Sequence, residues 1–382
     1  MGEITDRSGS DNGAGWPRAV LVVFLLYLFL VGVKALESGI NGLGSGFTDA
    51  LFEGVSHPLA SLAVGILGTV LVQSSSVSTA TIVGLVGAGT LGFEAAVPMI
   101  MGANLGTTIT NTLVATAYLR PGREFRRAFA GATMHDFFNL TAVAVLLPIE
   151  LITGVLSRTA TWLTGLLRES GPVGIAQPDS PIKFVVGAPV RAMSNLLGDL
   201  GLSSAVVGVT LLVLGLGLIL VALSQITRNM RLLMVGRIER SLNAVLAKGA
   251  GVPAIAVGIV MTVAVQSSSI TTSILIPLIA AGVLTLPNAF PVTLGANLGT
   301  TVTALLASLA TARPEGLAIA LVHLLFNATG ILLIYPIPAI RRIPMALAEG
   351  LARVADGRRS LAILYVVGGF IVMPLVGLLV LR

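Results

Sequence analysis

Long apolar runs separated by short polar or basic loops dominate the chain. They predict a membrane helix at about 17–36 and another at about 204–226, each followed by apolar segments that polar residues interrupt. Runs of about 20 apolar residues without period-two alternation are typical of membrane-spanning helices and not of a β-barrel. The pattern therefore predicts an all-α polytopic membrane protein.

The same succession of elements is predicted twice. Each copy has a first helix, a loop, two interrupted apolar segments and a long closing helix. The interrupted segments lie at about 58–92, 93–118, 252–286 and 287–312, the closing helices at about 128–154 and 316–338, and a last apolar run at about 360–381. The pattern thus indicates two repeats and one additional membrane helix.

Two polar motifs recur at one offset. Gln73-Ser74-Ser75-Ser76 returns as Gln266-Ser267-Ser268-Ser269, and 266 − 73 is 193. The seven residues of 102–108 recur identically at 295–301, again 193 residues later. Two independent motifs in one register are not a coincidence, so the chain contains an internal duplication.

The duplication divides the chain. We expect a disordered tail (1–16), repeat 1 (17–154), an inter-repeat loop (155–203), repeat 2 (204–338), and a basic cytoplasmic segment with a final membrane helix (339–382). The first apolar run also resembles a signal peptide. Because the second repeat begins with an equivalent helix, we expect the first one to be retained.

The charges of equivalent loops predict that the copies are inverted. Residues 37–57 carry acidic residues and no Lys or Arg, whereas their counterpart, 227–248, carries four arginines and a lysine. Basic loops face the cytoplasm, so the two copies have opposite orientations, as in many secondary transporters. One interrupted segment of each pair must then be re-entrant, and the sequence does not say which. The N-terminus is expected in the cytoplasm and the C-terminus outside.

Composition agrees with this class of protein and excludes others. The 382 residues are 55% hydrophobic and only 10% charged, and the mean hydropathy is +0.96. The net charge of +6 lies in short loops between apolar runs, which argues against nucleic acid as a partner. The chain has no cysteine, which excludes disulfides, thiolate metal sites and a cysteine nucleophile.

The candidate chemistry lies in uncharged polar residues. Residues 249–312 contain no charged side chain, yet they include a Gln-Ser-Ser-Ser run and several threonines. Such a run in an apolar segment bonds internally, to water or to a ligand. Helix–helix contacts are the alternative use of small hydroxyl residues. The glycines of the repeated motif, Gly102, Gly106, Gly295 and Gly299, favour unwound backbone. Half-helix N-termini with serine hydroxyls suit an anion, and carbonyls and amides suit Na⁺.

Asp136 is an ionisable residue within an apolar stretch that is predicted to form a membrane helix. Buried carboxylates in membranes usually face a cavity and mark ion pathways. The alternative is a hydrated carboxylate near the cytoplasmic end, because Arg127 lies only nine residues earlier. Asn139 follows on the same helical face. His135 and His323 are interpreted as structural hydrogen-bond donors and not as a metal site.

These motifs resemble the type II sodium/phosphate cotransporters. The stretch from Arg126 to Asp136 and the stretch from Phe326 to Pro338 add to the resemblance, which covers about 20–380. It implies Na⁺-coupled uptake of divalent inorganic phosphate, held between the two Gln-Ser-Ser-Ser motifs. The aspartate at position 136 implies an electrogenic member. The inter-repeat segment is shorter than in animal members and lacks cysteine, and a further C-terminal helix is missing, so the chain is similar to a bacterial form.

The resemblance also implies two ligand sets and no catalytic residue. The expected phosphate ligands are Gln73, Ser74, Ser75, Ser76, Gln266, Ser267, Ser268 and Ser269. The expected sodium ligands are Gln73, Ser76, Asn104, Thr107, Thr108, Asp136, Asn139, Gln266, Ser269, Asn297, Thr300 and Thr301. No cofactor is expected, and Na⁺ is the only metal ion.

Three other functions are alternatives. A sodium-coupled carrier of sulfate or a dicarboxylate would use similar groups, and an ion channel would show uncoupled flux. An intramembrane serine hydrolase would need one activated serine, and no Gly-x-Ser-x-Gly elbow is present. The expected partners are phosphate, Na⁺ and the lipid of a bacterial inner membrane, with a homodimer as one option for assembly.

Overall fold

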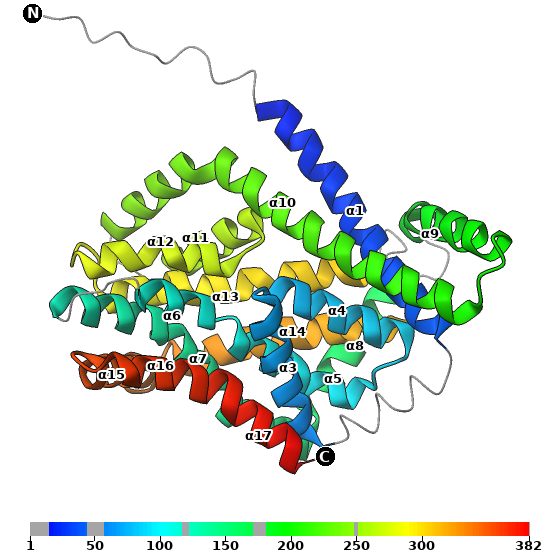
Figure 1. Ribbon diagram of the computed structural model, residues 1–382. Coiled ribbons are helices and arrows are strands. Elements are labelled where there is room, and N and C mark those ends of the chain that lie inside the picture. Colours follow the sequence, from blue (N-terminus) through cyan, green and yellow to red (C-terminus); the bar gives the residue numbers. More distant parts are fainter. Residues whose placement is uncertain (1–14, 44–56, 117–121, 171–180, 248–250, 382) are drawn as a thin grey trace, which may run out of the picture.

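The computed structural model describes residues 15–43, 57–116, 122–170, 181–247 and 251–381, and every regular element in these ranges is a helix (Figure 1). The predicted all-α class is therefore confirmed. The predicted N-terminal tail lies almost entirely outside the described residues, as do Asp49 and Glu53 of the acidic loop.

The helices of the first copy follow the predicted order. They are α1 (Gly15–Gly42), α3 (Pro58–Val72), α4 (Ser75–Ala88), α5 (Phe93–Gly106), α6 (Ile109–Thr116) and α7 (Arg123–Thr153). The second copy has α10 (Ser204–Ala247), α11 (Val252–Val265), α12 (Ser268–Ala280), α13 (Leu286–Ser308) and α14 (Pro314–Ile334). Then follow α15 (Pro338–Ala355), α16 (Arg359–Val367), a π-helical turn η1 (Gly368–Val372) and α17 (Met373–Val380).

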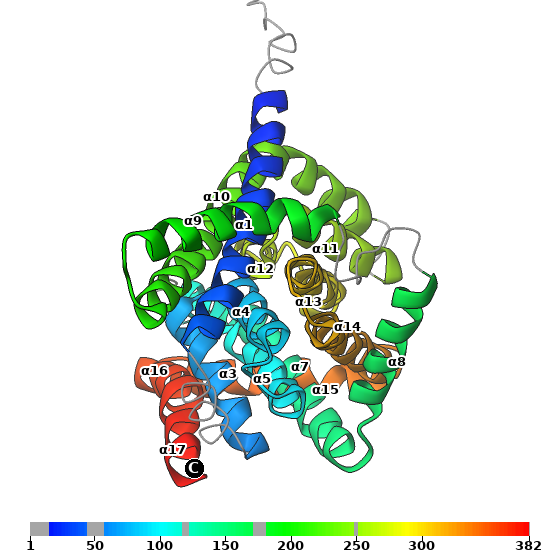
Figure 2. The same cartoon turned by 90° about the vertical axis from the view of Figure 1, so that its right-hand side faces the viewer.

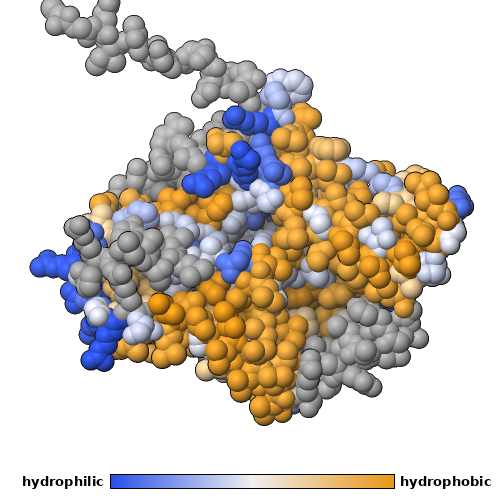
Figure 3. Space-filling model, in the orientation of Figure 1, coloured by the Kyte–Doolittle hydropathy of each residue, from blue (hydrophilic) through white to orange (hydrophobic). Residues whose placement is uncertain are grey.

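The chain is a membrane protein by the length and surface of its helices. Six helical segments in the described ranges are long and apolar enough to cross a bilayer: Trp16–Gly42, Arg123–Thr153, Ser204–Leu232, Leu286–Ser308, Pro314–Ile334 and Ser360–Val380. Figure 3 shows a broad hydrophobic surface, with hydrophilic residues gathered at the edge where α7 begins and α15 lies and in a second group beside the upper part of α1. Apolar side chains exposed over such an area require lipid and not water around them.

The segment between the copies is more ordered than the predicted loop. It holds α8 (Val155–Ser170) and α9 (Pro181–Asp199), separated by residues outside the described ranges. The carboxylate of Glu150, at the end of α7, accepts hydrogen bonds from the main-chain N–H groups of Leu156 and Ser157 and from the Ser157 hydroxyl. These bonds satisfy N–H groups at the start of α8, which explains why a helix begins directly after Gly154.

Three of the repeated glycines lie inside continuous helices, and the expectation of unwound backbone is wrong for them. Helix α13 runs without a break through Gly295 and Gly299, and α5 runs through Gly102 and ends at Gly106, before a short interruption. These glycines instead allow close helix packing. A Cβ atom at Gly102 would lie 2.0 Å from the Leu62 carbonyl oxygen of α3, and one at Gly295 would lie 2.0 Å from the Ile255 carbonyl oxygen of α11. Such contacts are typical of small residues in membrane helix pairs.

The first interrupted segment of each copy is a pair of short helices. Helices α3 and α4 have 15 and 14 residues, and α11 and α12 have 14 and 13. At about 1.5 Å per residue each is about 20 Å long, less than the roughly 30 Å of the bilayer core. Figure 1 shows α3 and α4 diverging from their junction, so that the junction lies inside the helix bundle.

The two copies pack together around their inner helices. Helix α4 contacts α13 and α14 of the second copy, and Figure 2 shows these helices beside α5 at the centre of the molecule. The first helices of the two copies, α1 and α10, lie along each other, and glycines such as Gly39 and Gly208 bring their backbones into contact. The core thus consists of elements from both repeats.

Candidate functional site

The two Gln-Ser-Ser-Ser breaks have the same backbone geometry. Gln73 ends α3 with φ 56° and ψ 25°, and Gln266 ends α11 with φ 56° and ψ 28°. In the described part of the chain, these are the non-glycine residues with positive φ. Ser74 (φ −151°) and Ser267 (φ −153°) then start the next helix. Two left-handed glutamines at equivalent positions show that the duplication extends to a strained local conformation.

Each break places a helix N-terminus within the bundle. Ser74 Oγ accepts a hydrogen bond from the main-chain N–H of Val77 at 3.3 Å, and Ser267 Oγ does so from Ile270 at 3.4 Å. Both serines are thus N-caps. The first turn of a helix presents N–H groups and a partial positive charge, which suit an anion.

The two breaks face each other. The Ser76 hydroxyl donates to the main-chain oxygen of Gln266 at 3.3 Å, and Thr303 Oγ1 lies 3.5 Å from Ser76 Oγ. A cavity of about 340 Å³ opens between the breaks. It is lined by Val72, Gln73, Ser74, Ser75, Ser76, Val77, Leu220, Leu223, Ser224, Thr227, Gln266, Ser267, Ser268 and Ser269. All eight predicted phosphate ligands therefore line one cavity.

The amide groups of both glutamines are held in the same way. Thr303 Oγ1 donates to Gln266 Oε1 at 2.9 Å, and Thr110 Oγ1 donates to Gln73 Oε1 at 3.3 Å. The two threonines are separated by the same 193 residues as the glutamines, 303 − 110. They were not among the predicted ligands, although this offset was the signal that could have found them.

Helix α10 supplies a third wall that the sequence analysis missed. Leu220, Leu223, Ser224 and Thr227 line the cavity, at the spacing of one helical face. Ser224 and Thr227 add hydroxyl groups to this wall. The spacing is visible in the sequence, but the partner of that face is not.

Four asparagines form a buried amide network instead of lining the cavity. Asn327 Oδ1 accepts hydrogen bonds from Asn104 Nδ2 at 2.6 Å and from Asn297 Nδ2 at 2.9 Å. Asn297 Nδ2 also contacts Asn139 Oδ1 at 2.8 Å, and the amide of Asn139 donates to the Asn104 main-chain oxygen at 3.1 Å. His323 Nε2 lies 3.2 Å from Asn104 Oδ1. The network joins helices of both repeats.

The four threonines predicted as sodium ligands are buried and bonded to the backbone. Each donates to a carbonyl oxygen three or four residues earlier: Thr107 to Ala103, Thr108 to Leu105, Thr300 to Ala296 and Thr301 to Leu298. None of them lines the cavity described above. In this conformation their hydroxyl groups bond to the main chain of α5 and α13 and of the short interruption between α5 and α6.

Asp136 is buried at a second site away from the cavity. The side chain lies in α7 and is 3% exposed. Its Oδ2 accepts hydrogen bonds from Thr112 of α6 at 3.3 Å and from Tyr365 of α16 at 3.0 Å, whereas Oδ1 is buried without a partner. Neither ion pair found among the described residues involves it. The described structure thus buries this carboxylate instead of leaving it at a hydrated surface. Tyr365 was not predicted.

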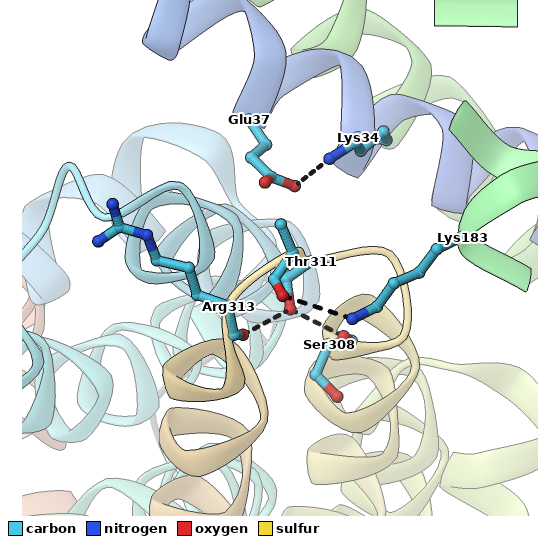
Figure 4. A network of polar contacts seen from close by, with 7 residues as sticks. Lys34, Glu37, Lys183, Ser308, Thr311 and Arg313 are labelled. Atoms are coloured by element: carbon cyan, nitrogen blue, oxygen red, sulfur yellow. Dashed lines mark hydrogen bonds and ion pairs between the residues drawn. The ribbon is translucent and has the colours of Figure 1, made fainter. Parts of the chain in front are cut away.

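A further group of polar side chains from α1 and α9 lies beside the turn between α13 and α14 (Figure 4). Lys34 and Glu37 of α1 form an ion pair of 3.1 Å. Lys183 of α9 donates to the main-chain oxygen of Ala312 at 3.5 Å. The ion pair explains how α1 holds two charged side chains within one turn of a membrane helix.

Comparison with known proteins supplies the family. Residues 28–165 and 218–348 match the model of the Na⁺/Pi-cotransporter family. The chain is 34% identical to "Sodium-dependent phosphate transport protein 2A" of Ovis aries in an alignment of 423 positions that covers 93% of this chain and 66% of the relative. It is 35% identical to "Sodium-dependent phosphate transport protein 2B" of Homo sapiens in an alignment of 447 positions that covers 94% of this chain and 65% of the relative.

The matched regions include both Gln-Ser-Ser-Ser breaks and Asp136. The chain spans slightly less than two thirds of the length of these relatives, 65–66%. No solved structure matches it significantly. The family model covers most of both copies, and this chain therefore belongs to the Na⁺/Pi-cotransporter family.

Proposed function

We propose that this chain imports inorganic phosphate into the cell together with Na⁺, and that the anion binds in the cavity between the two Gln-Ser-Ser-Ser breaks. The observation that carries the proposal is the juxtaposition of two helix N-termini, those of α4 and α12, around one cavity lined by serine hydroxyls. The names of the relatives supply the substrate and the coupling ion.

Phosphate would be held in this cavity by dipoles and not by charges. Among the described residues, the lining contains hydroxyl, amide and apolar groups and no Lys or Arg. Two helix N-termini and several hydroxyl donors can bind a divalent oxyanion. Without a fixed positive charge, a co-bound cation lowers the cost of moving that anion from water into the bundle. This provides a physical reason for coupling phosphate to Na⁺.

Asp136 is the proposed sodium ligand with the most direct structural support. Its carboxylate is buried with one oxygen free and no ion-pair partner among the described residues. Hard cations such as Na⁺ prefer oxygen ligands. Gln73 and Gln266, at the ends of α3 and α11, offer further oxygens beside the anion. For Asn104, Asn139 and Asn297 to ligate Na⁺, the amide network must open.

The transport cycle we propose is alternating access by inverted repeats. The charges of equivalent loops support inversion, with the N-terminus in the cytoplasm and the C-terminus outside a bacterial inner membrane. The pairs α3–α4 and α11–α12 are then the re-entrant segments, since each half is too short to cross the bilayer. Phosphate and Na⁺ would reach the central cavity from one side at a time.

Uptake of radiolabelled phosphate into proteoliposomes tests the proposal. An inward Na⁺ gradient should drive accumulation, and an equal choline gradient should not. Ser75→Ala and Ser268→Ala should each raise the half-saturating phosphate concentration several-fold. Ser308→Ala is the matched control, because its hydroxyl bonds to the Leu305 carbonyl away from the cavity. Equal uptake in choline would refute sodium coupling, and equal uptake of sulfate or succinate would favour another oxyanion.

A further inference from the structure

The last membrane segment of the chain reaches the buried carboxylate of α7. Tyr365 of α16 donates a hydrogen bond to Asp136 Oδ2 at 3.0 Å, across 229 residues of sequence. Thr112 contacts the same oxygen at 3.3 Å, but its hydroxyl is also 3.3 Å from the Thr108 carbonyl oxygen. A hydroxyl has one hydrogen to donate, so Tyr365 is the donor committed to Asp136.

The ring of Tyr365 is held on two sides. Phe137, next to Asp136 in α7, stacks on it with ring centroids 6.1 Å apart. Phe370 packs against it edge-on at 5.8 Å. Phe370 belongs to the π-helical turn η1, which begins three residues after Tyr365. Such turns are rare and occur frequently at functional sites, and here the turn carries an aromatic ring that fixes the tyrosine.

The opposite oxygen of the carboxylate is available. Asp136 Oδ1 is buried and has no hydrogen-bond partner. A carboxylate with one unpartnered oxygen in an apolar bundle is costly unless a cation or a proton neutralises it. The Tyr365 bond to Oδ2 fixes the rotation of the carboxyl group and thereby the direction in which Oδ1 points.

We propose that Tyr365 is a positioning residue for the cation that Asp136 binds. Its hydroxyl holds Oδ2 and leaves Oδ1 free for Na⁺, so that the last membrane segment becomes part of the sodium site. This inference rests on the proposed sodium role of Asp136 and adds a residue and an element to it. Because α16 lies outside both repeats, the site has no equivalent in the second copy. There the stretch from His323 to Asn327 matches the stretch from His135 to Asn139 at an offset of 188, so position 136 corresponds to Leu324.

The test is a sodium titration of Tyr365→Phe, which removes only the hydroxyl. The purified protein is melted at increasing NaCl with choline chloride keeping ionic strength constant, since a cation that binds the folded state raises the melting temperature. A lost hydrogen bond to a charged group should raise the half-saturating Na⁺ concentration roughly 10-fold or more. In proteoliposomes the same shift should occur, with the maximal rate at saturating Na⁺ within about twofold of wild type.

Tyr335→Phe is the matched control, because that tyrosine lies against Arg341 and not against Asp136. Phe370→Leu keeps the Tyr365 hydroxyl but removes one ring that holds it, and it should produce a smaller shift in the same direction. This second variant decides the question if Tyr365→Phe does not fold.

The outcomes separate this inference from the proposed function. If Na⁺ changes neither the melting temperature nor the phosphate uptake of the wild-type protein, both the proposed function and the role of Tyr365 are contradicted. If the wild-type protein responds to Na⁺ and Tyr365→Phe has the same half-saturating Na⁺ concentration, only the role of Tyr365 is contradicted. A fall in maximal rate without a shift in the sodium titration also contradicts it, because that result indicates packing. A melting temperature that depends on pH but not on the Na⁺ concentration would also contradict the inference, because it would indicate that Asp136 Oδ1 binds a proton and not Na⁺.

Discussion

The hydroxyl of Ser76 donates a hydrogen bond of 3.3 Å to the main-chain oxygen of Gln266, joining two residues that lie 190 positions apart in the chain. Ser76 belongs to the first break and Gln266 to the second, so one bond links the two motifs. The oxygen it reaches is at the end of α11, where a left-handed glutamine stops the helix. The breaks are therefore two halves of one polar site and not two separate sites.

The close packing of α3 on α5 leaves no room for a side chain at Gly102. Gly102→Ala would place a Cβ atom 2.0 Å from the Leu62 carbonyl oxygen, and such overpacking costs about 1–3 kcal/mol. Gly295→Ala should behave alike against Ile255 of α11. Thermal unfolding in detergent should show a clear loss of stability for both variants.

Gly68→Ala is the control for this prediction. Gly68 lies on α3, the helix against which Gly102 packs, and a Cβ atom there meets nothing within 4 Å. It should be neutral or stabilise the helix by up to about 1 kcal/mol. Equal melting temperatures for Gly102→Ala and wild type would show that the two helices separate easily.

The amide network should depend on Asn327 as its shared acceptor. Asn327→Ala leaves the amide groups of Asn104 and Asn297 with one acceptor fewer, and a buried unsatisfied donor costs roughly 1–3 kcal/mol. Melting temperature should fall by more than for Asn229→Ala, whose amide bonds only within its own helix. A similar effect of both substitutions would indicate that the network contributes nothing specific.

Asp136 should give the transport cycle its voltage dependence. A membrane potential acts on a moving charge with about 2.3 kcal/mol per 100 mV, and a buried carboxylate changes the net charge carried with phosphate. Wild-type uptake in proteoliposomes should rise with an inside-negative potassium diffusion potential, whereas Asp136→Gly should keep some uptake and lose this response. Voltage dependence that survives Asp136→Gly would assign the moving charge to another residue.

The sequence predicted the repeated elements but not the roles of residues that depend on contacts with other helices. Most helices of both copies and the interruptions of their apolar segments follow from apolar runs and from one repeated motif, because those signals are local. The expected loop at 227–248 is wrong, since α10 continues to Ala247 through these basic residues. The role of Gly102 was misjudged, since glycine permits both unwinding and close packing, and only the position of α3 decides between them. Tyr365 was missed because its hydroxyl meets Asp136 through tertiary packing that no periodic pattern records.

The cavity between the breaks can be probed with cysteines, because the natural chain contains none. Ser74→Cys and Ser267→Cys place one thiol on each side of the cavity. Ser203→Cys, in the exposed residues before α10, is the control. Labelling by a small water-soluble maleimide is measured with Na⁺ present, with and without phosphate.

Phosphate should slow labelling at both cavity positions and leave the control unchanged. Protection of only one of the two thiols, or of neither, would contradict the binding of a single phosphate between the two Gln-Ser-Ser-Ser breaks.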